Sequence, residues 1–266
     1  MILAQHVSTG YGDLEVIHDL TFEIKEKGIY VLLGKNGAGK TTILRLLAGV
    51  LKPWKGLFRR EGSIAYLPHY IALPPEMRVK EALDFLSRIL NANYSSVIEE
   101  LDLKDLLGKK ISDLSQGQKK RVSLSRVFMR EKDIYLLDEP TDNLDPVFAS
   151  KVREKVVSLS KSKIVIYTSH NLYEAKEIGK YVMVMDNGRL IRFCTMDELR
   201  TGEYVVGIRA SSDLSKILEG HYEGDYFVVK LPDPSMVNEV IQKLLRENIT
   251  IYEVKEMRNP LEELLR

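Results

Sequence analysis

The segment with the clearest chemical meaning is the glycine-rich stretch GKNGAGKTT at residues 34–42. Its spacing, G-x-x-x-x-G-K-[ST], lets the backbone curl so that successive N–H groups face one point and form a nest for an anion. The apolar run GIYVLL precedes it at 28–33, and TTILRLLAGV follows with apolar residues at helical spacing. The segment therefore predicts a strand, a phosphate-binding loop and a helix whose N-terminus adds partial positive charge.

The side chains of this loop could hold a nucleoside triphosphate. Lys40 would reach the β- and γ-phosphates, the Thr41 hydroxyl would ligate Mg²⁺, and Thr42 could reach the α-phosphate. A glycine-rich turn that carries a lysine by chance is the alternative, and the strand before the loop and the helix after it disfavour it. The phosphate-binding candidates are Gly34, Asn36, Gly37, Ala38, Gly39, Lys40, Thr41 and Thr42.

Two adjacent acids end a second apolar run, in the segment IYLLDE. The carboxyl end of a strand is where open α/β sheets place their ligands. Asp138 would hold Mg²⁺ through water, and Glu139 could polarise an attacking water as general base. Taken alone, two acids after a strand are common in solvated turns. The phosphate loop makes the catalytic interpretation the better one.

Several other elements must position these groups. The alternation and apolar runs predict strands at 2–7, 20–24, 133–139 and 163–170, and a helix at about 146–161. Asn187 and Gly188 supply the turn of a hairpin in YVMVMDNGRLIRF, and Gly49 is a C-cap candidate. Residues 75–108 look mainly helical and stop at Gly108.

The pattern changes from about Thr201, where strand-like and helix-like segments alternate on a small scale. The predicted strands are GEYVVGIRA, DYFVVKL and ITIYEVKEM, and the predicted helices are SSDLSKILEG and DPSMVNEVIQKLLREN. We therefore expect a main domain at 1–200 and a small α+β domain at 201–266.

The composition limits the classes of function. Lys plus Arg (39) nearly balances Asp plus Glu (38), so no overall field favours nucleic acid. The single cysteine, Cys194, excludes an internal disulfide and favours a reducing compartment. No run approaches the ~20 apolar residues of a membrane span, so a membrane role would need a partner.

Four further motifs stand in order with the phosphate loop and the two acids: Tyr11 in TGYGDLEVIHDL with Val16 nearby, LSQGQ at 114–118, NLDP at 143–146, and His170 after the strand KIVIYTS. With these motifs, residues 1 to about 200 resemble an ABC-transporter ATPase. LSQGQ resembles the family signature LSGGQ, and NLDP resembles the D-loop. His170 resembles the switch histidine, and Tyr11 resembles the aromatic residue that stacks on adenine. An ordinary exposed tyrosine, a structural histidine and a plain helix cap at Ser115 are the alternatives.

The resemblance implies an α/β fold: a P-loop NTPase core with a mainly parallel sheet, an antiparallel β subdomain, a helical insertion at about 72–130 and the C-terminal appendage. It implies ATP and Mg²⁺ as ligands, with Glu139, His170 and Lys40 catalytic. It further implies a head-to-tail homo- or heterodimer in which Ser115, Gly117 and Gln118 contact the ATP of the other subunit. The partner would be an integral membrane transporter subunit, which would hold the chain at the cytoplasmic face of the membrane.

The chain departs from the family pattern at two positions. Gln116 replaces the first glycine of the signature, while Ser115 and Gly117 remain. His69, in YLPH, stands where the family has a glutamine that touches Mg²⁺ and the membrane partner. Imidazole suits Zn²⁺ or Cu²⁺ better than Mg²⁺, so we expect His69 to keep only the partner contact. An ordinary loop histidine is the alternative.

Two other functions are alternatives to transport. A cytosolic ABC ATPase without transport work, in cluster assembly or translation, is one alternative, although a single cassette disfavours the tandem translation factors. A chromosome-maintenance ATPase is the other, and the chain lacks the heptad run and basic surface it would need. The ending NPLEELLR loosely resembles exporter ATPases for drugs or polysaccharides, which favours export.

Overall fold

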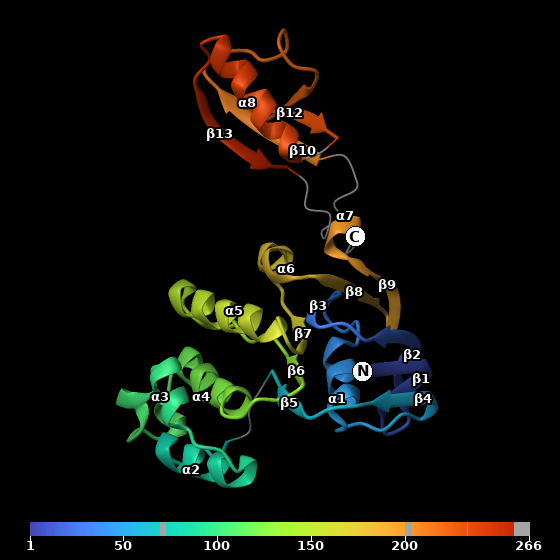
Figure 1. Ribbon diagram of the computed structural model, residues 1–266, viewed down its shortest axis with the longest axis vertical. Coiled ribbons are helices and arrows are strands. Elements are labelled where there is room, and N and C mark those ends of the chain that lie inside the picture. Colours follow the sequence, from blue (N-terminus) through green and yellow to red (C-terminus); the bar gives the residue numbers. More distant parts are fainter. Residues whose placement is uncertain (70–72, 200–203, 233, 258–266) are drawn as a thin grey trace. The chain divides into compact units, whose positions relative to one another are not determined.

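In the computed structural model the chain folds into two compact units, Met1–Phe193 and Cys194–Arg266 (Figure 1). The division lies a few residues before the change of pattern near Thr201. The tail 259–266, with its resemblance to exporters, lies outside the described part of the chain. The structure describes residues 1–69, 73–199, 204–232 and 234–257.

A six-stranded sheet forms the centre of the first unit, in the order β5-β6-β7-β3-β8-β9. The pairs β5–β6, β6–β7, β7–β3 and β3–β8 are parallel. The apolar runs of the sequence form its inner strands, and every residue of β3, β6 and β7 is buried. The strands are β3 (Gly28–Leu33), β5 (Ile64–Leu67), β6 (Ile134–Leu137), β7 (Ile164–Thr168), β8 (Tyr181–Asp186) and β9 (Arg189–Thr195).

An antiparallel sheet of three strands, in the order β2-β1-β4, forms the β subdomain. Its strands are β1 (Ile2–Tyr11), β2 (Leu14–Ile24) and β4 (Lys55–Arg60). The sequence predicted shorter spans for the first two strands, 2–7 and 20–24. Register shifts along the β1–β2 pair interrupt the strict alternation, so the pattern is lost although the pairing continues to Tyr11 and Leu14.

Helix α1 (Lys40–Ala48) joins the two sheets, because it contacts β2 on one side and β5 and β6 on the other. Its buried residues Ile43, Leu44, Leu46 and Leu47 belong to one hydrophobic core with strand residues of both sheets. The helix ends at Gly49, whose left-handed backbone donates hydrogen bonds to Arg45 and Leu46, as the sequence predicted. The phosphate loop is therefore anchored at both ends by the core.

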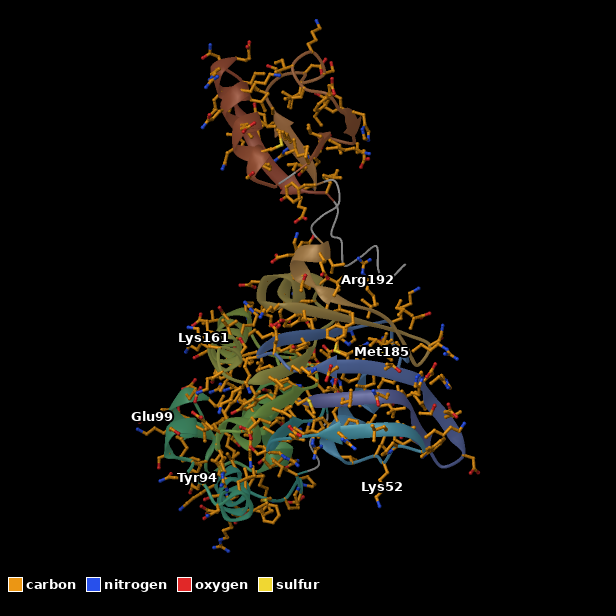
Figure 2. All side chains as sticks on the ribbon, turned by 45° about the vertical axis from the view of Figure 1, so that its right-hand side comes forward. Lys52, Tyr94, Glu99, Lys161, Met185 and Arg192 are labelled. Carbon is orange, nitrogen blue, oxygen red and sulfur yellow. The ribbon has the colours of Figure 1, made fainter. Side chains whose placement is uncertain are left out.

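Among the remaining helices of the first unit, α5 contacts the inner strands β7 and β3, and α4 contacts the edge strand β5. The helical insertion contains α2, α3 and α4 (Figure 1). Figure 2 shows Tyr94 and Glu99 on this insertion and Lys52 beside the β subdomain, at opposite ends of the unit. The helices are α2 (Val79–Leu90), α3 (Ser95–Glu100), α4 (Gln116–Phe128), α5 (Pro146–Ser160) and α6 (Leu172–Ile178), with short 3₁₀ turns at Lys104–Leu106 and Ile111–Asp113. The predicted α/β class with its β subdomain and helical insertion is confirmed.

The second unit is a small α+β fold with its own core. Its four-stranded sheet has the order β11-β12-β10-β13, and Leu244 of α8 packs into a cluster with Phe227 and Ile249. The segment 211–220 forms turns instead of the helix that the sequence suggested. Asp213 accepts hydrogen bonds from the backbone and hydroxyl of Ser215, and such local bonds compete with a helix. The elements are α7 (Met196–Leu199), β10 (Tyr204–Ala210), β11 (His221–Glu223), β12 (Tyr226–Leu231), a 3₁₀ turn at Pro234–Met236, α8 (Val237–Arg246) and β13 (Ile251–Glu256).

Candidate active site

The glycine-rich loop crosses from the end of β3 to the start of α1, and two of its glycines are required by the backbone. Gly34 has φ 153° and Gly39 has φ 104°, in the region that side chains rarely adopt. A Cβ atom on Gly34 would lie 2.5 Å from the Met185 carbonyl oxygen, and one on Gly39 would lie 2.7 Å from Ile17. The tight turn therefore brings the loop backbone onto the surrounding core.

Lys40 folds back over this loop. Its Nζ donates to the carbonyl oxygens of Gly34 at 2.6 Å and Lys35 at 3.2 Å. Burial lowers the pKa of Lys40, and the negative charges of Glu139 and Asp138 oppose that shift. The ammonium group is thus held inside the turn, where it can exchange carbonyl oxygens for phosphate oxygens.

Asp138 lies at the carboxyl end of β6 and is almost fully buried. Its Oδ2 accepts a hydrogen bond from the Thr41 hydroxyl at 2.9 Å, and its Oδ1 accepts one from the Thr168 hydroxyl at 2.9 Å. A carboxylate beside a hydroxyl is a hard-oxygen donor set of the kind that Mg²⁺ prefers. Asp138 and Thr41 therefore fit the ion that the sequence expected there.

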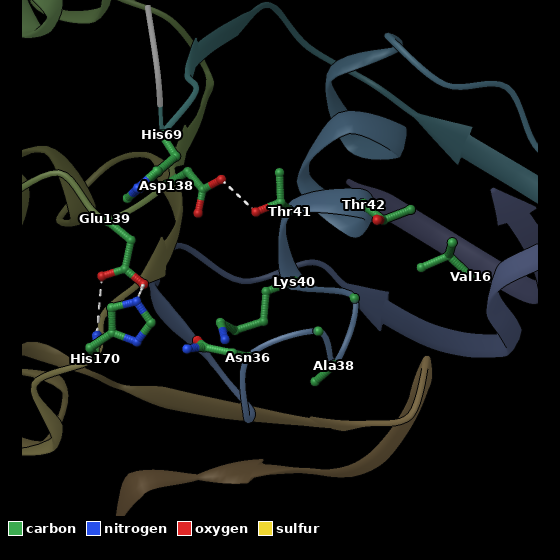
Figure 3. Close-up of a pocket in the computed structure, with 12 residues that line it drawn as sticks. Val16, Asn36, Ala38, Lys40, Thr41, Thr42, His69, Asp138, Glu139 and His170 are labelled. Atoms are coloured by element: carbon green, nitrogen blue, oxygen red, sulfur yellow. Dashed lines mark hydrogen bonds and ion pairs between the residues drawn. The ribbon is translucent and has the colours of Figure 1, made fainter. Parts of the chain in front are cut away.

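Glu139 lies next to Asp138 and faces His170 instead (Figure 3). Its carboxylate accepts a hydrogen bond from the His170 backbone N–H at 3.1 Å, and the His170 ring Nε2 lies 3.1 Å from Oε1. Burial raises the pKa of Glu139, and His170 opposes that shift. A buried carboxylate with a raised pKa is a better proton acceptor than an exposed one.

These groups line one cavity of about 320 Å³ (Figure 3). The expected metal ligands and catalytic groups therefore meet in space although 130 residues separate Lys40 from His170. His69, the position that departs from the family, lines the same cavity. The lining residues are Val16, Asn36, Gly37, Ala38, Gly39, Lys40, Thr41, Thr42, His69, Asp138, Glu139 and His170.

Tyr11 lies beside this cavity without lining it. Its hydroxyl is 3.4 Å from the Thr42 hydroxyl and accepts a hydrogen bond from the Arg45 guanidinium at 2.9 Å. The Arg45 guanidinium also lies over the Tyr11 ring, 5.6 Å from its centroid. Tyr11 is 38% exposed, so its side chain is accessible to a base.

The signature residues lie apart from the cavity, at the N-terminus of α4. The Ser115 hydroxyl accepts from the Gln118 N–H at 3.2 Å, and the Gln118 side chain accepts from the Ser115 N–H at 3.1 Å. A Cβ atom on Gly117 would lie 2.6 Å from the Asn143 carbonyl oxygen, so the helix start approaches the NLDP segment closely. Ser115, Gly117 and Gln118 are thus not brought to the phosphate loop of their own chain.

Sequence reasoning missed three residues that hold this site. Thr168 bridges Asp138 and the Glu139 backbone, Arg45 holds Tyr11, and Lys120 donates to the Glu139 carbonyl oxygen at 2.7 Å. A threonine at the end of a buried strand is a weak signal for such a role. The sequence around Arg45 and Lys120 gives no signal, because their partners come from distant segments.

Comparison with known proteins places the chain in a family. Residues 17–142 match the family model described as ABC transporter. Nod factor export ATP-binding protein I of Burkholderia orbicola is 31% identical over 207 residues, which cover 70% of this chain and 68% of the relative. Molybdate/tungstate import ATP-binding protein WtpC of Pyrococcus abyssi is 29% identical over 245 residues, covering 85% and 71%.

Two solved structures share the fold. An ATP-binding subunit of an ABC transporter aligns with a TM-score of 0.68 and 24% identity, over 75% of this chain and 92% of that one. A dimeric ATP-binding cassette in a post-hydrolysis state with ADP and Pi aligns with a TM-score of 0.65 and 20% identity, over 74% and 99%. The chain belongs to the ABC transporter family, among its ATP-binding subunits, which are the ATPases of these transporters.

Proposed function

We propose that the cavity binds ATP and that Glu139 is the general base of its hydrolysis. The observation that carries the proposal is the shared cavity, in which Glu139 and His170 lie across from the phosphate loop and Lys40. The loop backbone and Lys40 bind the β- and γ-phosphates, and Thr42 reaches the α-phosphate. Tyr11 stacks on the adenine, and Val16 is a lesser contact.

In the reaction, a water oxygen bonds to the γ-phosphorus while the bond to the β–γ bridging oxygen breaks and ADP leaves. Glu139 accepts the proton of the water, and the ring of His170 holds its carboxylate in place at 3.1 Å. The ammonium of Lys40 balances the negative charge that accumulates on the phosphate oxygens. Thr41 and Asp138 would hold Mg²⁺, which supplies further charge stabilisation at the phosphates.

The signature residues act in trans in this proposal. Ser115, Gly117 and Gln118 lie at a helix N-terminus outside the cavity of their own chain, and such a terminus attracts phosphate. In a head-to-tail dimer they contact the γ-phosphate of ATP in the other subunit. Either a homodimer or a heterodimer satisfies this geometry.

We propose that the ATPase drives an integral membrane partner and that the transporter they form is an exporter. No helix of the described residues is long and apolar enough to cross a membrane. We propose that this partner holds the chain at the cytoplasmic face of the membrane. A relative named for export at 31% identity supports the direction, although a relative named for import is 29% identical. A cytosolic ABC ATPase without transport work is the alternative.

The test compares Glu139→Gln with Lys40→Ala in the full chain. Glu139→Gln removes the base but keeps the size of the side chain, so turnover falls by about 10²-fold or more while ATP binding persists. Lys40→Ala weakens ATP binding itself. Glu131→Gln, which removes a carboxylate whose side chain is 81% exposed, is the matched control and keeps full turnover. Full turnover in Glu139→Gln would overturn the proposed role.

A further inference from the structure

Lys120 is a buried lysine that the proposed mechanism does not use. It lies in α4, only 7% exposed, and its Nζ donates to the carbonyl oxygen of Glu139 at 2.7 Å. Burial lowers the pKa of Lys120, and the charges of Asp142, Glu139 and Asp138 oppose that shift. Burying an ammonium group costs free energy unless it is paired, so the burial of Lys120 against the Glu139 carbonyl oxygen needs a structural explanation.

The reason lies in the backbone of Glu139. Its φ is 51°, a left-handed conformation that is uncommon for a residue other than glycine. The following residue is Pro140, which disfavours the right-handed helical alternative at Glu139. A backbone in such a conformation persists only when its surroundings hold it.

The surroundings hold Glu139 from both sides. Its N–H donates to the Thr168 hydroxyl at 2.8 Å, within the core. Its carbonyl oxygen accepts from Lys120 and, at 3.3 Å, from the N–H of Asp142. Because the direction of a side chain follows from its backbone, these bonds fix where the carboxylate of Glu139 points.

The Lys120 bond also crosses between two parts of the first unit. Lys120 belongs to α4 of the helical insertion, the helix that begins with the signature residue Ser115, whereas Glu139 follows β6 of the parallel core. A displacement of α4 would therefore pull on the backbone of Glu139.

We propose that Lys120 is a positioning residue for the general base, which keeps the Glu139 backbone in its left-handed conformation and links it to the signature helix. The inference rests on the proposed role of Glu139. It predicts a defect in the chemical step and little defect in nucleotide binding, because Lys120 does not line the phosphate cavity.

The experiment measures kcat and the ATP dissociation constant for Lys120→Met and Lys120→Gln in the full chain. Lys120→Met keeps the approximate length but loses the donor, so kcat falls about tenfold or more while the dissociation constant changes less than about twofold. Lys120→Gln keeps an N–H donor and recovers part of kcat. Lys119→Met, one residue earlier in α4, is the matched control and keeps the parental kcat.

A second arm separates positioning from a structural role and from failure of the proposed function. In the Glu139→Gln background, adding Lys120→Met lowers the residual turnover no further, because the base is already gone. ADP affinity and the unfolding midpoint are measured in parallel. If Lys120→Met does not fold, its lost ADP binding shows this, and the Lys120→Gln variant is then used for the test. An unchanged kcat in Lys120→Met, or equal losses of kcat and affinity in both variants, overturns the inference. Full turnover in Glu139→Gln overturns the proposed function instead.

Discussion

Asp138 and Glu139 show how neighbouring residues receive different tasks at the scale of single side chains. The carboxylate of Asp138 accepts hydroxyl hydrogen bonds from Thr41 and Thr168, which keep it beside the phosphate loop. The carboxylate of Glu139 points to His170. In our proposal, Asp138 therefore holds Mg²⁺, and Glu139 accepts the proton of the attacking water.

His69 gives a prediction at the residue scale. It lines the phosphate cavity and also a second cavity beside α4, and Figure 3 shows it next to Asp138. Mg²⁺ prefers oxygen ligands, so we expect the imidazole not to ligate it. His69→Ala should leave the Mg²⁺ dependence of ATPase nearly unchanged and weaken coupling to the membrane partner, and His69→Gln should preserve or raise Mg²⁺ affinity.

The measurement is the ATPase rate of each variant titrated against Mg²⁺. A large loss of Mg²⁺ affinity in His69→Ala would show that the histidine is a ligand. Unchanged coupling to the partner would leave it an ordinary loop residue.

At the scale of elements, helix N-termini differ in how they are capped. Helix α1 has Gly39 at its N-cap position, with no side-chain cap and no acidic residue in its first turn. Helices α4, α5 and α6 are capped by Ser115, Asp145 and Asn171. The N–H groups at the start of α1 are therefore available to a phosphate, as expected for a phosphate-binding loop.

The cap of α4 gives a prediction that separates stability from catalysis. Ser115→Ala removes the cap and should lower the free energy of unfolding by about 1 kcal/mol. Ser115→Asp restores a good cap and should recover that stability. It should not recover ATPase, because a carboxylate would face the γ-phosphate of the partner site. Denaturant unfolding and ATPase assays on both variants make the test, and normal turnover in Ser115→Asp would contradict the trans contact.

At the scale of the whole molecule, each unit has a hydrophobic core of its own. Leu244, fully buried in the second unit, and Leu44, fully buried in α1, are matched positions for a test. Leu244→Ala should destabilise the second unit by about 2–5 kcal/mol and leave ADP affinity unchanged. Leu44→Ala should lose a similar amount and weaken ADP binding, because α1 carries the phosphate loop. Calorimetric titration with ADP distinguishes them, and a weakened ADP affinity in Leu244→Ala would show that the units are coupled.

The dimer gives the second prediction at this scale. A Lys40→Ala subunit lacks its own phosphate contact, and a Ser115→Arg subunit blocks the site of its partner. Each should be inactive alone, whereas a mixed dimer retains one intact composite site, so ATPase activity should reappear on mixing. Each variant mixed with itself is the control. If tagged subunits prove that mixed dimers form and no activity returns at any ratio, head-to-tail sharing is wrong.

The sequence by itself determined the features that depend on neighbouring residues. The spacing of Gly34, Gly39 and Lys40 gives the phosphate loop, because the turn is a property of its own backbone. The apolar runs give β3, β6 and β7, and parallel strands place their carboxyl ends at one edge. The meeting of Asp138 and His170 with the loop therefore followed from pattern and order, and the predicted fold and family resemblance are confirmed.

Only the tertiary structure decided the contacts between segments that no local rule pairs. The backbone of Glu139, which is left-handed, forms hydrogen bonds with Thr168 and Lys120, which lie 29 and 19 residues away. The bond from Arg45 to Tyr11 depends on the packing of α1 against the β subdomain. Such pairings arise because side chains of different elements share one core, where burial makes each unpaired polar group costly. The sequence around a polar residue does not indicate which distant group will be its hydrogen-bond partner.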